Sequence, residues 1–189
     1  MPDPNTAALA FLQTRRSRPA KTLGLPVPDR EELAALLTIA ARTPDHGKLE
    51  PWRFIVVDKA GMAKLSEQVY ARAIEIGKDD QQAKSACGQF DMGNLAVVVV
   101  EVQKEGLIPE IEQSYSAGCV CLSLLNAALA SGWGANWLSG WPSHDRKLMR
   151  QAIGLADNER VAGIIHIGTE TSAPPERPRP DVEALTTWL

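Results

Sequence analysis

Apolar side chains are most concentrated in the middle of the chain, between Gln113 and Gly132. This stretch contains no Asp, Glu, Lys or Arg, and Ala117, Val120 and Leu124 recur in it at helical spacing. A helix that is apolar almost all round is typical of an interior, so the pattern predicts a long, buried central helix. Serine and asparagine interrupt it, and it lacks the unbroken apolar run of roughly eighteen residues that a membrane span needs. Such a helix is hard to cover on every side in a short chain, which favours a partner subunit.

Three other apolar runs predict strands of a core sheet. Trp52–Val57 and Val161–Ile167 are typical of buried strands. Leu95–Val102 is the strongest of the three, and its unbroken apolar character indicates that both of its faces are covered. A short additional strand is expected at 134–139.

Capping signals and apolar periodicity predict the helices. The first begins at Asp3 or Asn5 and ends at a basic cluster, where Pro19 stops it. The second begins with Asp29 and Glu32, which have capping-box spacing. Further helices are expected over 60–76 and over 145–153, the latter capped by Ser143, whereas 78–85 is charged and expected to be exposed. Two helices ahead of alternating strands and helices favour an α+β sandwich, with helices flanking a central sheet of about four strands.

Length and charge limit the organisation and the partners. The chain has 189 residues, which is most simply one domain, here 1–171, followed by a C-terminal extension at 172–189. A net charge of −3 favours neither nucleic acid nor an anionic membrane as a partner. The N-terminal segment places its charges after its apolar part, the reverse of a signal peptide, so a cytoplasmic location is expected.

The C-terminal extension has two parts. Four prolines fall within 172–180, which favours an extended backbone. Val182, Leu185, Trp188 and Leu189 follow and are unusually apolar for a free end. A frayed terminus is the alternative, but packing of this end on a partner subunit is the expectation.

Several common catalytic patterns are missing from the sequence. It contains no G-x-S-x-G elbow, no P-loop and no complete dinucleotide fingerprint. His46, His144 and His166 lack metal-ligand spacing, and His166 is expected to be a hydrogen-bonded core histidine. The three cysteines make no disulfide framework and are interpreted as small apolar residues. The sequence therefore predicts neither a metal site nor a side-chain nucleophile.

Two basic clusters at the edges of loops remain as candidate chemistry. The arginine cluster, Arg15-Arg16-Ser17-Arg18, supplies guanidiniums and a hydroxyl that suit a phosphate group. Complementing the dipole of the preceding helix is its alternative role. The second cluster runs from Arg42 to Lys48, between a core helix and a core strand, where loops often carry function.

The order of these motifs resembles the FMN-dependent nitroreductase family, in particular a small, minimal subgroup of it. The chain carries R-R-S-R near its start, R-x-P-D-H-x-x-x-x-P-W-R-F, an S-A-G helix, and then G-x-x-x-x-W-x-S-G. The likeness covers nearly the whole chain. It implies a homodimeric α+β sandwich, with a central mixed sheet of four to five strands and FMN bound at the subunit interface.

The resemblance also implies roles for residues in three segments. The FMN-contacting residues implied are Arg15, Arg16 and Ser17 in the first segment, Arg42 and His46, reaching from the partner subunit, in the second, and Trp137, Leu138 and Ser139 in the third. The flavin would carry a hydride from NAD(P)H to a small electron-poor acceptor such as a nitroaromatic or a quinone, so no catalytic side chain is required.

The chain departs from the family pattern at three positions. Glu50 replaces the usual Gln before Pro-Trp, and it is unfavourable near a reduced flavin unless it faces away or pairs with Lys48 or Arg53. Leu138 stands where related chains carry Arg, and Pro19 replaces a basic residue.

Two alternative functions stay open at this point. One is another flavin reduction, such as dehalogenation or enal reduction, for which Lys78–Phe90 is the candidate lid. The other is flavin binding without turnover, which the departures at Glu50 and Leu138 would favour.

Overall fold

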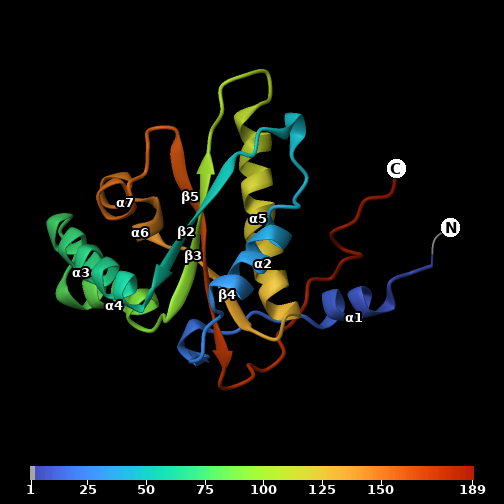
Figure 1. Ribbon diagram of the computed structural model, residues 1–189, viewed down its shortest axis with the longest axis horizontal. Helices are drawn as coiled ribbons and strands as arrows, with labels where there is room; N and C mark the ends of the chain where they lie inside the picture. The colour runs from blue at the N-terminus through green and yellow to red at the C-terminus, as the bar shows by residue number, and fades with distance from the viewer. Residues whose placement is uncertain (1–2) are drawn as a thin grey trace.

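The computed structural model describes residues 3–189, and Figure 1 shows their helices and strands along the chain. The helices are α1 (Thr6–Thr14), α2 (Arg30–Ala40), α3 (Lys59–Glu75), α4 (Asp80–Asp91), α5 (Glu110–Ala130), α6 (Trp141–His144) and α7 (Arg146–Ile153). The strands are β1 (Leu23–Gly24), β2 (Trp52–Asp58), β3 (Leu95–Val102), β4 (Gly134–Leu138) and β5 (Glu159–Glu170). The expected α+β class is confirmed.

The five strands form one sheet in the order β1-β5-β3-β2, with β4 also paired to β5. Every pairing in the described part of the chain is antiparallel, so the expected mixed sheet is wrong. Apolar runs report burial and not strand direction. The run in β3 is long because helices cover both of its faces, a situation that is most common in parallel sheets.

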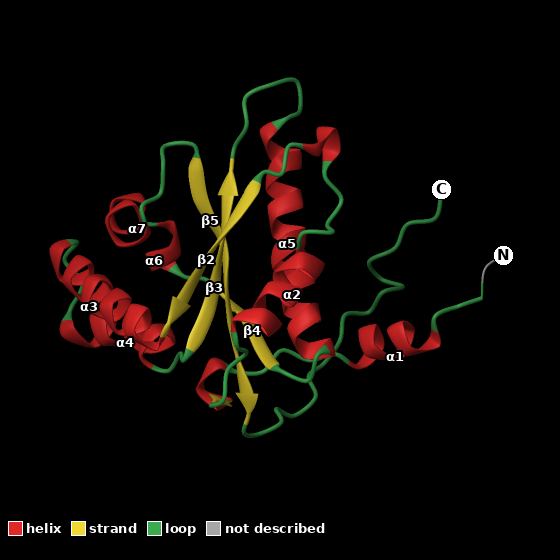
Figure 2. Ribbon diagram, in the orientation of Figure 1, coloured by secondary structure: helices red, strands yellow, loops and turns green. Residues whose placement is uncertain are grey.

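Helices lie on both faces of the sheet (Figure 2). Val97 and Val99 of β3 point into a core formed with α2 and α5. Val98 and Val100 point to the opposite face, into a core formed with α3, α4 and α7. All four valines are at most 2% exposed, which confirms that β3 is covered on both sides.

The central helix α5 is buried on one face only, so the expectation of burial nearly all round is wrong for a single copy. Val120 and Leu124 are fully buried against the sheet. Ile111, Tyr115 and Leu122 are 54%, 65% and 45% exposed. Their spacing places them along one side of the helix, which is therefore an apolar stripe facing away from the sheet.

Local capping explains where several helices begin. The side chain of Asp29 accepts from the backbone N–H of Glu32, and Glu32 accepts from that of Asp29, which confirms the capping box of α2. The N-cap of α7 is Asp145, whose Oδ1 accepts from Leu148 N at 2.8 Å, and not Ser143 as expected. An aspartate is as good a cap as a serine, and Ser143 lies inside α6.

Two segments differ from expectation in burial. Residues 78–85 are mostly exposed as expected, with Lys78 half-buried and Ala83 buried. The candidate lid 78–90, however, is largely the helix α4, which buries Ala83, Cys87 and Phe90 near α3. These apolar positions have helical spacing, but two of the three are small and all lie among polar residues. Trp52–Val57, expected to be buried, is the edge strand β2, in which only Val57 is buried.

His166 lies in the core as expected, but without the expected hydrogen bonds. It is 1% exposed, and neither ring nitrogen has a partner within residues 3–189. Burial lowers the pKa of His166 to about 4, because the charged imidazolium is costly away from water. Gly93 lies so close that a Cβ there would be 3.0 Å from the ring Nδ1.

The C-terminal extension leaves β5 and runs past α1 (Figure 1). Leu185 and Trp188 are 76% and 90% exposed. Packing of this end on a partner therefore stays a prediction. Among the residues that the structure describes, no helix has the length and apolarity needed to cross a membrane.

Candidate functional site

The arginine cluster forms where α1 ends and the chain turns back toward the sheet. Arg15 has φ −54° and ψ 139°, so it leaves the helical conformation, and its N–H still bonds to Phe11 O. The guanidinium of Arg15 donates to Ser17 Oγ at 3.0 Å. Arg18 N donates to Ala135 O at 2.8 Å, which fixes the cluster beside β4.

The arginine cluster has more positive charge than its neighbours neutralise. Arg18 pairs with Glu170 at 2.7 Å. The Nε atoms of Arg15 and Arg16 are buried and have no hydrogen-bond partner within residues 3–189. Burial lowers the pKa of Arg15, and the charges of Arg179, Arg16 and Arg18 lower it further. Buried N–H donors with no acceptor are costly, so this arrangement suits an external anion.

The segment Trp137-Leu138-Ser139 ends β4 and lies next to the arginine cluster through the bond from Arg18 to Ala135. Trp137 is 37% exposed. Its indole lies over Gly163 of β5, where a Cβ would be 2.2 Å from Nε1. A side chain at position 163 would therefore displace the indole, which explains the glycine in the middle of a strand. The first and third segments are thus brought together.

The loop of residues 42–50, called the 42–50 loop below, lies along the outer part of α5. Thr43 Oγ1 is 3.1 Å from Ser123 Oγ, Ser116 Oγ donates to Pro44 O at 3.0 Å, and His46 Nδ1 is 2.6 Å from Glu112 Oε2. These bonds fix the loop, yet Arg42 and His46 remain exposed.

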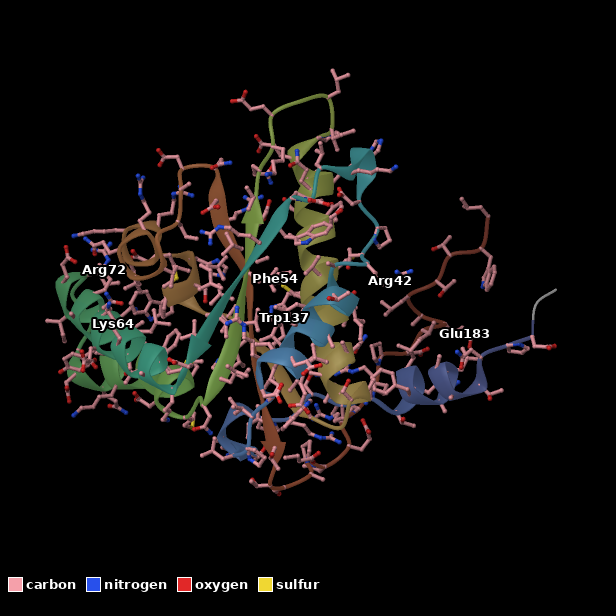
Figure 3. All side chains as sticks on the ribbon, in the orientation of Figure 1. Arg42, Phe54, Lys64, Arg72, Trp137 and Glu183 are labelled. Carbon is pink, nitrogen blue, oxygen red and sulfur yellow. The ribbon has the colours of Figure 1, made fainter. Side chains whose placement is uncertain are left out.

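One copy of the chain does not bring the 42–50 loop to the arginine cluster. The loop bonds to α5 between Glu112 and Ser123, whereas the cluster bonds to Ala135, beyond the C-terminal end of that helix. Figure 3 shows Arg42 set apart from Trp137. The predicted second segment therefore stands alone in the single copy.

The backbone of the 42–50 loop is locally left-handed. Gly47, Lys48 and Glu50 have φ values of 76°, 55° and 48°. Gly47 suits this conformation, and a Cβ there would also lie 3.1 Å from the side chain of Ile108. The two other residues hold a less favourable conformation, which costs on the order of 1 kcal/mol each.

Glu50 is exposed and makes no ion pair with the described residues. Of the two alternatives for Glu50, pairing is not formed, because Arg53 binds Glu159 at 2.6 and 2.7 Å and Lys48 forms no ion pair in residues 3–189. The carboxylate of Glu50 is therefore open to solvent or to another molecule.

A cavity of about 250 Å³ lies between α7 and the start of β5. The guanidiniums of Arg146 and Arg160 that line it already have hydrogen-bond partners. Arg146 donates to the carbonyl oxygens of Ala156, Asp157 and Glu159, and Arg160 binds Glu101. Within residues 3–189 no group of three His, Cys, Asp or Glu side chains is placed to hold a metal. The arginine cluster is the stronger candidate site.

The cysteines agree only partly with their interpretation as small buried residues. Cys87 and Cys121 are buried, whereas Cys119 is exposed on the outer side of α5. Burial raises the pKa of the Cys121 thiol to about 12, so this cysteine is not a nucleophile.

Comparisons with known proteins identify similar sequences and folds. Residues 13–169 match the model of the family described as "Nitroreductase family". The Escherichia coli (strain K12) protein named "Putative NAD(P)H nitroreductase YdjA" is 32% identical over 163 residues, which cover 86% of this chain and 87% of that protein.

Two solved structures have the same architecture. The nitroreductase-like family protein from Bacillus cereus matches with a TM-score of 0.81 at 22% identity, covering 100% of this chain and 99% of that one. The nitroreductase with bound FMN from Bacteroides fragilis NCTC 9343 matches with a TM-score of 0.74 at 18% identity, covering 96% and 98%. At these identities the likeness shows the fold.

Proposed function

Because this chain belongs to the nitroreductase family of oxidoreductases, we propose that it binds FMN and transfers a hydride from NAD(P)H to electron-poor acceptors such as nitroaromatics or quinones. The observation that carries the proposal is the arginine cluster, with two buried guanidinium Nε atoms that lack a partner in the described chain. FMN ends in a phosphate, which is a strong acceptor for such donors. The FMN bound by the Bacteroides fragilis structure supports the same choice of cofactor.

The first and third segments together would hold one FMN. Arg15, Arg16 and Ser17 bind the phosphate and the adjoining chain of hydroxyls. Trp137, Leu138 and Ser139, at the end of β4 beside the cluster, would orient the flavin ring. The contact of Trp137 with Gly163 restricts the indole and so keeps its exposed edge in place. This fixed geometry favours binding because little side-chain freedom is lost.

The second segment would come from another copy of the chain. Its bonds to α5 hold Arg42 and His46 outward and away from the arginine cluster of their own copy. The apolar stripe of Ile111, Tyr115 and Leu122 lies on the outer side of the same helix. Covering that stripe with a second copy removes apolar surface from water. It also offers each arginine cluster a 42–50 loop from the other copy, in a homodimer with two sites.

The chemistry divides between the cofactor and the chain. FMN, when bound, supplies the capacity to accept a hydride and pass it on. Arg42 and Lys48 would contribute positive charge, and His46 a ring nitrogen for hydrogen bonding, which would stabilise negative charge on a reduced ring. Trp137 and the apolar stripe exclude water from the site. NAD(P)H and the acceptor use the same space in turn.

Anaerobic mixing tests this function directly. Purified protein is reconstituted with FMN and mixed with NADH or NADPH while the flavin absorbance is followed, and then a nitroaromatic or a quinone is added. The proposal expects bleaching by a nicotinamide and recovery of the yellow colour with the acceptor. A chain that binds FMN and never bleaches is a binding protein, and that result rejects the enzymatic proposal.

A further inference from the structure

Gln113, a buried polar residue near the start of α5, fixes the loop that connects β3 to α5. This loop consists of residues 103–109 and is called the 103–109 loop below. Gln113 is 2% exposed. Its Oε1 accepts from Lys104 N at 2.8 Å, and its Nε2 donates to Lys104 O and Ile108 O at 3.0 and 3.2 Å. Burial of an amide is costly unless the amide is hydrogen-bonded, so one satisfied side chain holds the loop near both of its ends.

The 103–109 loop contacts the 42–50 loop through Ile108. A Cβ at Gly47 would lie 3.1 Å from Cγ1 and 3.4 Å from Cδ1 of Ile108, so the isoleucine side chain lies directly against the backbone of Gly47. Figure 1 shows the turn at residues 46–48 beside the N-terminal end of α5. At the same end, Oε2 of Glu112 lies 2.6 Å from Nδ1 of His46. Two adjacent contacts therefore hold this turn to the start of α5.

The conformation that these contacts hold is strained. Lys48 and Glu50 have positive φ values, and such residues persist only where their surroundings fix them. Within the loop, Lys48 N donates to Asp45 O at 3.3 Å and Glu50 N donates to Asp45 Oδ2 at 2.7 Å. Both bonds require the left-handed turn, so opening of these two amides reports on the conformation of the 42–50 loop.

We propose that Gln113 is a positioning residue for flavin reduction: it fixes Ile108, Ile108 fixes Gly47, and the turn at Gly47 sets where His46 and Lys48 lie. The inference rests on the proposed function, in which the 42–50 loop serves the flavin held by the arginine cluster of the other copy. Groups that stabilise a reduced ring must be aimed at it in advance. A misplacement on the order of 1 Å can lower a rate about 100-fold, so an amide that touches no substrate can still act on the reaction.

Hydrogen exchange of the Lys48 and Glu50 amides tests this positioning without flavin. Gln113→Met keeps the length of the side chain and loses all three hydrogen bonds, whereas Ile108→Ala removes the packing on Gly47. Each should quicken exchange of both amides about fivefold, the scale of one lost hydrogen bond.

Leu107→Ala is the matched control for the exchange measurement. Leu107 precedes Ile108 in the same loop but is 100% exposed, so its truncation should leave both amides unchanged. The proposal is rejected if Gln113→Met leaves the exchange unchanged, or if Leu107→Ala quickens it as much as Ile108→Ala.

The rate of flavin reduction by NAD(P)H tests whether the positioning acts on the chemistry. Gln113→Met should lower this rate about tenfold and lower the flavin potential, because the loop would no longer be aimed at the ring. In a mixed dimer with an Arg15→Ala chain, one site combines the intact arginine cluster of the Gln113→Met chain with the intact loop of the Arg15→Ala chain. Activity should return through that site. A general structural defect of the Gln113→Met chain would impair both sites, so no return of activity would contradict the positioning role.

A second mixture, of Arg15→Ala with Arg42→Ala, separates failure of this inference from failure of the proposed function. If the second mixture regains activity and the mixture with Gln113→Met does not, the positioning role is wrong and the shared site stands. If neither regains activity, both the shared site and a role of Gln113 in it are wrong. A wild-type chain that binds FMN but is never reduced by NADH or NADPH rejects the proposed enzyme activity, whatever the exchange of the two amides shows.

Discussion

The arginine cluster and the 42–50 loop are both basic, yet they are built in opposite ways. In the cluster, guanidinium nitrogens are buried and lack acceptors in residues 3–189. In the 42–50 loop, three hydrogen bonds to α5 fix the chain while Arg42 and His46 are exposed. Buried donors without partners suit a small anion that fills the site. A well-fixed loop with outward side chains suits a larger surface, such as a second copy. Positive charge alone does not reveal this difference; burial and hydrogen bonding do.

Removal of the C-terminal extension should have the largest effect, and it should act on both regions. Deleting everything after Thr171 removes Arg179, whose charge acts on Arg15, and removes the apolar end predicted to pack on the partner. We expect a protein that is mostly monomeric and mostly colourless, measured by size-exclusion chromatography with flavin absorbance on the same peak.

A chain ending at Pro180 is the matched control for this deletion. It keeps Glu176 and Arg179 and loses only the apolar end, so it should bind FMN better than the shorter chain while still dimerising poorly. A yellow, stable dimer of the chain ending at Thr171 would contradict the prediction and show that α5 suffices for assembly.

Arg15→Ala should give the next largest effect and acts on the arginine cluster alone. Loss of hydrogen bonds between charged groups costs about 1.5–3 kcal/mol, which corresponds to about 10- to 150-fold weaker FMN binding. Arg30→Ala, an exposed arginine in the first turn of α2, is the control and should leave FMN affinity unchanged. If Arg15→Ala binds FMN as tightly as the wild type, the assignment of the FMN phosphate to this cluster is wrong.

Lowering the pH should reduce the stability of the fold through His166. This residue of β5 pairs with Asn136 of β4 in the sheet. The folded pKa of about 4 lies below the ordinary value of 6.5, so the unfolded chain binds more protons between these pH values. The free energy of unfolding should therefore fall by about 2 kcal/mol between pH 7 and pH 5 from this group. Denaturant titrations of wild type and His166→Leu at both pH values check this, and equal pH dependence in the two proteins would refute it.

Glu50→Gln should give the smallest effect and sharpens the picture of the 42–50 loop. The carboxylate is exposed and unpaired in the described chain, so its removal should change stability by less than about 0.5 kcal/mol. If it faces the flavin of the other copy, the flavin potential should rise and reduction by NAD(P)H should quicken, because a nearby negative charge opposes reduction. An unchanged potential would mean that Glu50 points elsewhere.

Much of the fold followed from local patterns. The Asp29 and Glu32 capping box, the apolar run of β3 and the long helix α5 each depend on a short segment of the sequence, and the structure has all three. Antiparallel strand direction was not predictable, because side-chain burial is the same in either direction. Helix α4 was missed because its small apolar residues give a weak pattern.

The candidate site was less accessible to sequence reasoning. The arginine cluster was identified from its composition, but its unsatisfied Nε atoms depend on tertiary burial. The effect of Arg179 on Arg15 was missed because 160 or more residues separate Arg179 from Arg15, Arg16 and Arg18, and no local signal links them. The apolar stripe on α5 was hidden in a helix that is apolar on nearly every side, so only the packing of one copy reveals which side is free.

Subunit complementation tests the central claim, that one site combines the arginine cluster of one copy with the 42–50 loop of another. Arg15→Ala and Arg42→Ala proteins are each purified, then mixed under conditions that exchange subunits, and FMN reduction by NAD(P)H is measured. In a mixed dimer one site carries both substitutions and the other carries neither. The account predicts that each variant alone is weakly active and that the mixture regains activity through the intact site. No gain on mixing, with exchange confirmed, would place both residues in one copy's site or outside the site altogether, and would contradict the shared site.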